Sequence, residues 1–230
     1  MIEILEPEIH VWWLSLESEP PAVERSFRLL STEEQARADR FHFPRDRRRF
    51  VLARASLRML LGDYTGEAPA RVSLQISSSG KPFLADRANL HFNLSHCEDR
   101  GVLAIARRPI GVDLERLRAV PEALSIAGNL FAPSESGALR AFPAELRSEA
   151  FLRCWTRKEA YVKARGVGLS VPLTSFEVTL DDGPPRLSFL EEPAEGKWSL
   201  HDVGAGPGWT GAIAVQLESP RLMGRVFPVC

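Results

Sequence analysis

The same order of predicted elements occurs twice along this chain of 230 residues. In each half, a long helix that ends at glycines is followed by a run of short strands. The first long helix is predicted at residues 47–61 and the second at 148–165, and the strand 102–106 corresponds to 211–215. The identity between the halves is low, so the correspondence depends on the order of elements. It predicts an α+β fold of two similar subdomains related by a pseudo-two-fold axis, each a long helix packed on a small, mainly antiparallel sheet.

The two predicted subdomains comprise residues 1–118 and 119–230, with a boundary near residues 118–121. Because ligand sites often form between subdomains, we expect the functional cleft there. A single α+β domain without internal symmetry is the alternative that the order of elements leaves open.

Local signals place the other expected elements. Residues 9–16 are rich in β-branched and aromatic side chains, which predicts the first strand, ended by Pro20 and Pro21. Ser31 and Glu34 have the spacing of a capping box, which predicts a helix from there to about residue 40. The remaining strands are expected at residues 72–76, 82–84, 90–94, 102–106, 176–180, 187–190, 198–203 and 210–217, and around Asp113 and Glu115 within residues 108–116.

The composition argues against several classes of partner. The net charge of −1 gives no overall attraction to nucleic acid or to an anionic membrane, and no apolar run reaches the length of a membrane span. The N-terminal residues lack the basic-then-apolar pattern of a signal peptide. Cys97, Cys154 and Cys230 have no metal-ligand spacing and suggest a reducing compartment. We therefore expect a cytoplasmic protein that binds neither nucleic acid nor a membrane.

Two carboxylates lie two positions apart in the strand predicted within residues 108–116. Asp113 and Glu115 share one face of this strand, and Val112 and Leu114 share the other. Adjacent carboxylates repel each other unless a positive group lies between them, and an oxygen-preferring divalent cation is the simplest such group. The alternative, which these residues alone favour, is the solvated acidic face of a half-exposed edge strand.

The second long helix carries a third acid. Trp155, Glu159 and Lys163 are spaced by four residues and form one stripe. A Glu159 that faces Asp113 and Glu115 would complete an all-oxygen site that suits magnesium, and Lys163 can bind a phosphate. The alternative is an exposed glutamate–lysine pair on a helix, worth only about 0.2–0.5 kcal/mol.

Further polar groups can bind phosphate. Ser95 and His96 end the strand predicted at 90–94, although a capped turn with a surface histidine is the alternative there. Lys81 lies in a turn, Gly80-Lys81-Pro82, which is a weak signal by itself. The arginines between residues 45 and 58 can bind nucleic acid or a small polyphosphate. We favour the polyphosphate, because aromatic residues do not interleave with these arginines.

Together, these motifs resemble the 4′-phosphopantetheinyl transferases of the surfactin-synthetase-activating (Sfp) type. Each motif is weak alone, but the ordered set from about residue 31 to residue 176 is specific. The matching motifs are Arg40-Phe41, Arg49-Phe50-Val51-Leu52-Ala53-Arg54, Gly80-Lys81-Pro82, Phe92-Asn93-Leu94-Ser95-His96, Gly111-Val112-Asp113-Leu114-Glu115, Trp155-Thr156-Arg157-Lys158-Glu159-Ala160-Tyr161-Val162-Lys163 and Gly166-Val167-Gly168-Leu169.

The resemblance implies a monomer that binds coenzyme A in the cleft between its two subdomains. It implies a magnesium-dependent enzyme, a holo-[carrier protein] synthase, that transfers the 4′-phosphopantetheine arm of coenzyme A to a serine of an apo acyl or peptidyl carrier protein. The second product is adenosine 3′,5′-bisphosphate. Such carriers serve fatty-acid, polyketide and nonribosomal-peptide biosynthesis.

The resemblance also implies roles for individual residues. Asp113, Glu115 and Glu159 are expected to hold Mg²⁺, with Mn²⁺ as an alternative. The expected catalytic residues are Glu159, Lys163 and His96, with Glu159 as metal ligand, as general base for the serine proton, or as both. The expected coenzyme A ligands are Arg37, Arg49, Arg54, Lys81, Ser95, His96, Lys158 and Lys163.

The chain departs from the family pattern at Glu34, where the family has a basic residue. Arg37 alone is then left in that segment to bind the 3′-phosphate of coenzyme A. Two other functions use the same residues: a magnesium-dependent phosphohydrolase with water as the nucleophile, and a non-enzymatic module that binds coenzyme A or a carrier protein.

Overall fold

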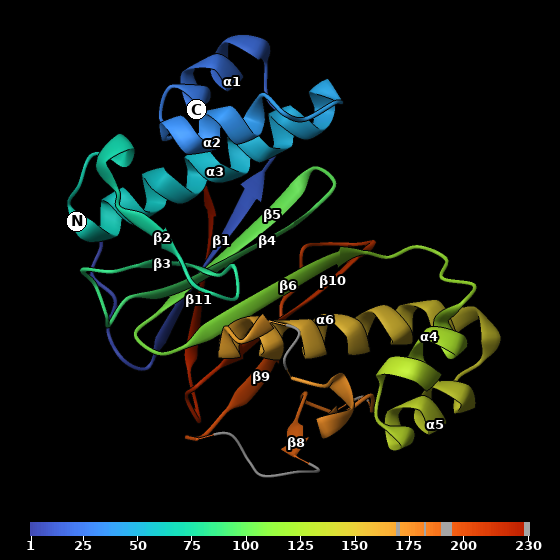
Figure 1. Cartoon of the computed structure of the whole chain (residues 1–230). Helices are drawn as coiled ribbons and strands as arrows, with labels where there is room; N and C mark the ends of the chain where they lie inside the picture. The colour runs from blue at the N-terminus through green and yellow to red at the C-terminus, as the bar shows by residue number, and fades with distance from the viewer. Residues whose placement is uncertain (169–170, 182, 190–194, 228–230) are drawn as a thin grey trace.

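The computed structural model describes residues 1–168, 171–181, 183–189 and 195–227. Its first sheet has the order β11-β1-β5-β4, and only the β11–β1 pair is parallel. The helix α3 covers one face of this sheet, and α1 and α2 lie outside α3 (Figure 1). The elements are β11 (Arg221–Phe227), β1 (Glu8–Ser15), β5 (Arg100–Ala106), β4 (His91–Cys97), α1 (Pro20–Phe27), α2 (Thr32–Ala38) and α3 (Pro44–Thr65).

The second sheet is antiparallel and has the order β6-β10-β9. The helix α6 covers one face of it, and α4 and α5 pack beyond α6 (Figure 1). These elements are β6 (Ile110–Arg116), β10 (Trp209–Val215), β9 (Ser199–Asp202), α4 (Ala123–Leu130), α5 (Pro133–Ala141) and α6 (Arg147–Arg165). Two small hairpins and three single-turn helices complete the described chain: β2 (Leu74–Ile76) with β3 (Pro82–Leu84), β7 (Phe176–Val178) with β8 (Leu187–Phe189), Pro69–Arg71, Ala144–Leu146 and Leu173–Ser175.

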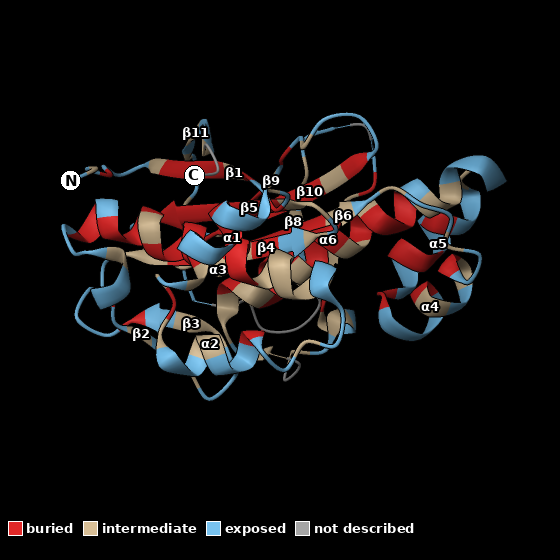
Figure 2. Cartoon of the chain, turned by 90° about the horizontal axis from the view of Figure 1, so that it is seen from above, coloured by how far each residue is buried: buried red, intermediate tan, exposed pale blue. Residues whose placement is uncertain are grey.

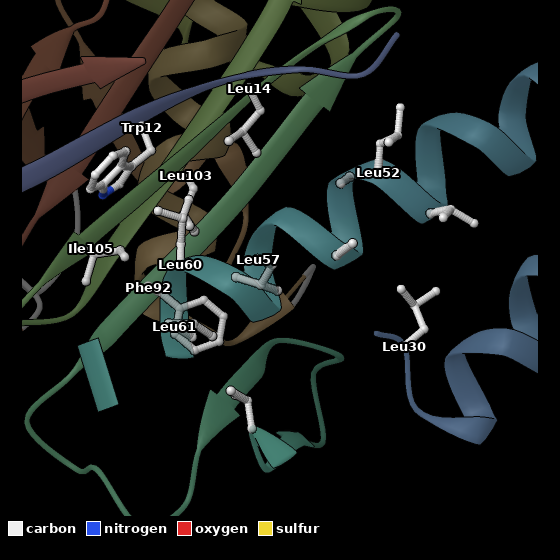
Figure 3. Packing of buried hydrophobic residues seen from close by; sticks show 14 of the residues in the cluster. Trp12, Leu14, Leu30, Leu52, Leu57, Leu60, Leu61, Phe92, Leu103 and Ile105 are labelled. Atoms are coloured by element: carbon white, nitrogen blue, oxygen red, sulfur yellow. The ribbon is translucent and has the colours of Figure 1, made fainter. Parts of the chain in front are cut away.

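Strand alternation divides the interior into three apolar cores. In β1, Trp12 and Leu14 point to α3, as Figure 3 shows, whereas Ile9 and Val11 join a core shared by the two sheets. The same alternation holds in β5, β6 and β10. The shared core includes Val102, Ala104, Ile110, Val112, Leu114, Ile213 and Val215, all with at most 2% of their surface exposed. Each sheet therefore has one helix-covered face and one face against its neighbour, and Figure 2 shows these central layers as buried.

The helices and sheets confirm the α+β fold predicted from the order of elements. The predicted capping box begins α2, because the amide of Glu34 donates to Ser31 Oγ at 3.3 Å and the amide of Ser31 donates to Glu34 Oε2 at 2.9 Å. Both long helices end at a glycine with positive φ, 78° at Gly66 and 64° at Gly166. These angles favour glycine, which has no Cβ to clash.

The helix α1 and the strand β11 were not expected. Pro20 and Pro21 were read as the end of a strand, but they also open α1, because proline is tolerated in the first turn of a helix. The strand β11 was not predicted, since half of its residues are exposed and its pairing with β1 is not local. Leu190, Leu169 and Cys230, named in the sequence predictions, lie outside the described residues.

The division at residue 118 is corrected by the strand pairing. The strand β6 precedes residue 118, yet it pairs with β10 in the second sheet. The strand β11 lies near the end of the chain, yet it extends the first sheet beside β1. A cut at residue 118 would therefore remove a strand from each sheet, so each sheet contains strands from both predicted halves. Strand partners that are far apart in sequence leave no local pattern that could place this boundary.

Candidate active site

The helix α6 crosses β6 in close contact at Gly111. A Cβ built on Gly111 would lie 2.1 Å from the carbonyl oxygen of Ala160 and 2.3 Å from the amide nitrogen of Ala164. Only glycine fits at this crossing, because any side chain would push the helix away from the strand. The contact brings the half-buried side of α6, which carries Glu159 and Lys163, over the acidic face of β6.

Asp113 lies at the centre of the site with only 5% of its surface exposed. Its Oδ1 accepts hydrogen bonds from Lys163 Nζ at 2.5 Å and from Ser95 Oγ at 3.0 Å. Its Oδ2 is buried and has no hydrogen-bond partner in the described part of the chain. A buried carboxylate oxygen without a partner is rare. The acidic face of β6 is therefore buried rather than solvated.

The two other acids are electrostatically coupled to Asp113. Burial, and then the charge of Asp113, raise the pKa of Glu115, whose Oε2 lies 3.3 Å from Arg118 Nη1. Burial also raises the pKa of Glu159; Lys163 opposes this shift, and Asp113 and Glu115 add to it. The carboxylates thus repel one another across the site, although Lys163 offsets part of their charge.

These acids fit a divalent cation in two respects. All three offer carboxylate oxygens, which Mg²⁺ and Mn²⁺ prefer, and Asp113 Oδ2 is a buried acceptor with no donor. In the described residues, no three acidic, histidine or cysteine side chains converge into a complete metal site by themselves. The Lys163 ammonium is the cation that lies against Asp113 in this structure.

The strand β4 supplies the neighbouring polar groups. Asn93 Oδ1 accepts the amide of Val112 at 2.9 Å, which joins β4 to β6 beside the acids. Ser95 follows on the same face and donates to Asp113. His96 points the other way, into a cavity of about 160 Å³ that Arg37 and Arg54 also line. Partial burial of its ring, and then the charges of Lys163, Arg49 and Arg54, lower the pKa of His96, so the imidazole is neutral near pH 7.

The expected arginines lie on the far side of this cavity. The Arg37 guanidinium lies 5.2 Å from the centre of the Phe50 ring, and Arg49 Nε lies 3.6 Å from Glu17 Oε1. Arg37 and Arg54 also line a second cavity, of about 550 Å³, between α2, α3 and β2. Arg37 and Arg54 therefore line both cavities, and Glu34, which also lines the second one, lies 3.4 Å from Arg54 Nε.

Two models of known protein families together match most of the chain. A family model described as "4'-phosphopantetheinyl transferase, N-terminal" matches residues 16–108, and one described as "4'-phosphopantetheinyl transferase superfamily" matches residues 109–215. The 4'-phosphopantetheinyl transferase HetI of Nostoc sp. is 38% identical over 218 residues, which cover 93% of this chain and 90% of that protein. This chain belongs to the 4′-phosphopantetheinyl transferases. The 4'-phosphopantetheinyl transferase Sfp of Bacillus subtilis is 31% identical over 157 residues, covering 68% of this chain and 69% of Sfp.

One solved structure is similar to half of this transferase. It is a holo-(acyl-carrier-protein) synthase from Bacillus anthracis in complex with CoA (3',5'-ADP), 25% identical, with a TM-score of 0.41 over 48% of this chain and 96% of that one. The two family models meet between residues 108 and 109, just before β6 begins. They therefore assign β6 to the second half, as its pairing with β10 does. Within the described residues of the transferase, no helix is both long and apolar enough to cross a bilayer.

Lys158, an expected coenzyme A ligand, lies in the core of the transferase instead. Its side chain is fully buried, with Nζ 2.8 Å from Glu135 Oε2. The ammonium also donates to the carbonyl oxygens of Leu173 and Phe176, both at 2.7 Å. Adjacent helix positions point about 100° apart, so the residue before a site-facing Glu159 faces the interior. The assignment of Lys158 as a ligand is therefore wrong for this structure.

Lys81 also lies away from its expected position at the nucleotide. Its Nζ donates to three backbone carbonyls, those of Ile110 at 2.9 Å, Lys163 at 2.6 Å and Ala164 at 3.2 Å. Burial lowers the pKa of Lys81 to about 8. All three hydrogen bonds of the Lys81 ammonium go to backbone carbonyls of β6 and α6. The expected contact of Lys81 with nucleotide phosphates is therefore wrong for this structure.

Sequence reasoning missed two residues that build the site of the transferase. Gly111 had no assigned role, although a glycine inside a strand signals a close approach of another backbone. Asn93 was named only as part of a family motif, with no role of its own, but its amide oxygen joins β4 to β6. No sequence pattern marks that bond, because its two residues lie on different strands.

Proposed function

We propose that the transferase moves the 4′-phosphopantetheine arm of coenzyme A to a serine hydroxyl of an apo acyl or peptidyl carrier protein. The serine oxygen forms a bond to the phosphorus of the arm, and the bond from that phosphorus to the bridging oxygen breaks. Adenosine 3′,5′-bisphosphate leaves with that oxygen. The observation that carries this proposal is the buried Asp113 carboxylate, whose Oδ1 binds Lys163 and Ser95 while Oδ2 has no partner in the described chain.

We propose that Mg²⁺, or Mn²⁺ in its place, binds at Asp113, Glu115 and Glu159. The donor set supports this, because hard cations take carboxylate oxygens and the repulsion among the three acids favours a positive charge between them. When bound, such an ion neutralises negative charge on the pyrophosphate as the leaving group departs.

The remaining groups are assigned to the substrate. Lys163, on α6, binds the pyrophosphate oxygens with Ser95 beside it, and His96, on the opposite face of β4, binds them from the cavity that it lines. Arg37 and Arg54, which line the two cavities, bind the nucleotide end together with Arg49, which lies beside Glu17. Glu159 accepts the serine proton, directly or through water, and burial raises its pKa, which makes it a stronger base than an exposed glutamate.

The setting of the reaction is proposed on the same basis. The thiols of Cys97 and Cys154 are free, which suits the reducing cytoplasm, and each chain carries all the assigned groups, which suits a monomer. A magnesium-dependent phosphohydrolase would use the same acids, with water in place of the serine.

Intact mass spectrometry tests the proposal. Purified protein is incubated with coenzyme A, Mg²⁺ and a panel of apo acyl and peptidyl carrier proteins. We expect one phosphopantetheine mass increase on at least one carrier and none on the same carrier with its acceptor serine changed to alanine. Cleavage of coenzyme A without a carrier would support the hydrolase, and binding without any product would reduce the protein to a binding module. Either result would overturn the proposed transfer.

A further inference from the structure

The turn between β2 and β3 is held rigid by its own hydrogen bonds. The amide of Ser77 donates to the carbonyl of Lys81 at 2.9 Å, and the amide of Lys81 returns a bond to Ser77 Oγ at 3.1 Å. Ser79 Oγ lies 2.8 Å from Ser77 Oγ. Gly80 has a φ of 85°, which favours glycine and lets the turn close. The turn therefore presents Ser79 and Lys81 in fixed directions.

Both side chains contact the C-terminal end of α6. The last carbonyls of a helix have no partner inside the helix, and a positive charge beside them is favourable. Lys81 Nζ binds the carbonyls of Lys163 and Ala164, and Ser79 Oγ binds that of Gly166 at 2.5 Å. The turn thus caps the helix although it lies more than 80 positions away in sequence.

The same ammonium holds both walls of the site. One wall is β6, where Lys81 binds the carbonyl of Ile110. Ile110 lies three positions before Asp113 in this strand. The other wall is α6, in which the carbonyl of Lys163 binds Lys81 while its side chain reaches Asp113. Lys81 is therefore placed to fix the backbone from which Lys163 extends.

We propose that Lys81 is a positioning residue for the transferase, which sets the distance between Lys163 and Asp113 by clamping the end of α6 to β6. It acts through Lys163 rather than on the nucleotide. This inference rests on the proposed phosphopantetheine transfer. Positioning of reacting groups is sensitive, since a displacement of about 1 Å can lower the rate about 100-fold.

The test compares Lys81→Met with the wild type in turnover and in nucleotide binding. The change removes all three donors but keeps the length of the side chain. We expect kcat to fall by about 10- to 100-fold. The Kd of adenosine 3′,5′-bisphosphate, measured by calorimetry with Mg²⁺, should stay within about twofold of the wild type, since a group that acts only on Lys163 leaves nucleotide contacts in place. Lys197→Met, an exposed lysine paired with Glu218, is the matched control and should change neither value.

A double variant separates positioning from a general loss of structure. If Lys81 acts through Lys163, Lys81→Met should lower kcat little further once Lys163→Met is present, because the group it positions is gone. A rise of tenfold or more in the Kd, or effects of the two changes that multiply, would overturn the inference.

If Lys81→Met does not fold, as judged by circular dichroism, Ser79→Ala and Lys81→Arg take its place. The inference then requires a lowered kcat with an unchanged Kd in Ser79→Ala, and a wild-type kcat in Ser79→Ala would overturn it whatever Lys81→Arg shows. Because calorimetry reads binding without turnover, a wild type that binds but never transfers would refute the proposed function instead.

Discussion

Lys163 Nζ lies 2.5 Å from Asp113 Oδ1, and this ion pair joins α6 to β6 across the centre of the site. The lysine side chain is 30% exposed and the aspartate side chain 7% exposed, so the pair lies at the edge of solvent. One carboxylate oxygen is saturated by Lys163 and Ser95, and the other has no donor in the described residues. Asp113 is therefore a half-satisfied anion, and a buried charge of this kind favours a second cation.

Asp113→Asn should abolish transfer while the protein remains folded. The amide keeps the shape of the carboxylate but loses the charge that binds Lys163 and the proposed cation. We expect kcat/KM to fall by about 10³-fold or more, and Mn²⁺ affinity, measured by electron paramagnetic resonance, to fall with it. Glu218→Gln, an exposed acid far from the site, is the control. Near-normal turnover in Asp113→Asn would refute the metal assignment.

Gly111→Ala should separate α6 from β6. The new Cβ would lie 2.1 Å from the carbonyl of Ala160, so the helix must shift, at a cost of about 1–3 kcal/mol in the free energy of unfolding. Turnover should fall as well, because Glu159 and Lys163 move with the helix. Gly137→Ala in α5 is a matched control, because nothing lies within 4 Å of its Cβ. It should leave activity unchanged and stabilise the helix by about 0.5–1 kcal/mol. Equal effects of the two substitutions in urea unfolding would contradict the close-contact argument.

Glu34→Gln should tighten coenzyme A binding. The carboxylate lies 2.6 Å from Arg58 Nε and 3.4 Å from Arg54 Nε, so it neutralises charge in the basic cavity. Glutamine can still close the capping box with Ser31, so the helix α2 should keep its start. We expect the Kd of coenzyme A to fall severalfold and that of 3′-dephospho-coenzyme A to change less. A Kd that rises or stays constant for both ligands would show that Glu34 only orders the two arginines.

Lys158→Met should destabilise the protein without weakening coenzyme A binding. Removal of one partner from a buried ion pair leaves the other charge uncompensated, which costs about 3–5 kcal/mol. Some of this cost is avoided here, because burial already raises the pKa of Glu135 and lets it take up a proton. Chemical unfolding measures the loss, and calorimetry below the unfolding transition measures the Kd. A large rise in Kd with unchanged stability would restore Lys158 as a ligand.

Stability should fall as the pH drops because of His10. Its ring is 2% exposed, its Nδ1 lies 2.6 Å from Tyr64 Oη, and burial lowers its pKa below the ordinary value of 6.5. As the pH falls below about 6.5, His10 takes up a proton in the unfolded chain but not yet in the folded chain. Protonation therefore favours the unfolded chain, and the free energy of unfolding decreases over this range. In His10→Gln, the slope of Tm against pH should flatten over this range. His42→Gln, at an exposed position, should leave the slope unchanged.

Local periodicity predicted the two walls of the site, and close packing brought them together. Alternation in β6 placed Asp113 and Glu115 on one face, and the four-residue spacing in α6 placed Glu159 and Lys163 on one stripe. Lys158 could have been assigned to the core from the same periodicity, because it is offset by one position from Glu159. The resemblance to the family took precedence over that argument and led to the wrong assignment.

The contacts that could not be predicted join segments far apart in sequence. In the sequence, Lys81 looks like an ordinary solvated lysine in a turn. Its partners, the carbonyls at the end of α6, lie beside it only in the folded protein. Asn93 likewise finds its partner only when β4 lies next to β6. Such bonds depend on the assembled tertiary structure, and no local propensity encodes them.

The pairing of β11 with β1 has a consequence for the order of assembly. The two strands are 213 positions apart at Glu8 and Arg221. The ribosome therefore synthesises β1 long before β11, the strand that completes its edge of the sheet. Until β11 arrives, β1 presents an open hydrogen-bonding edge beside the large apolar side chains of the α3 core. The nascent protein therefore passes through a period in which this edge is available to other chains, and timely arrival of β11 protects it from misassembly.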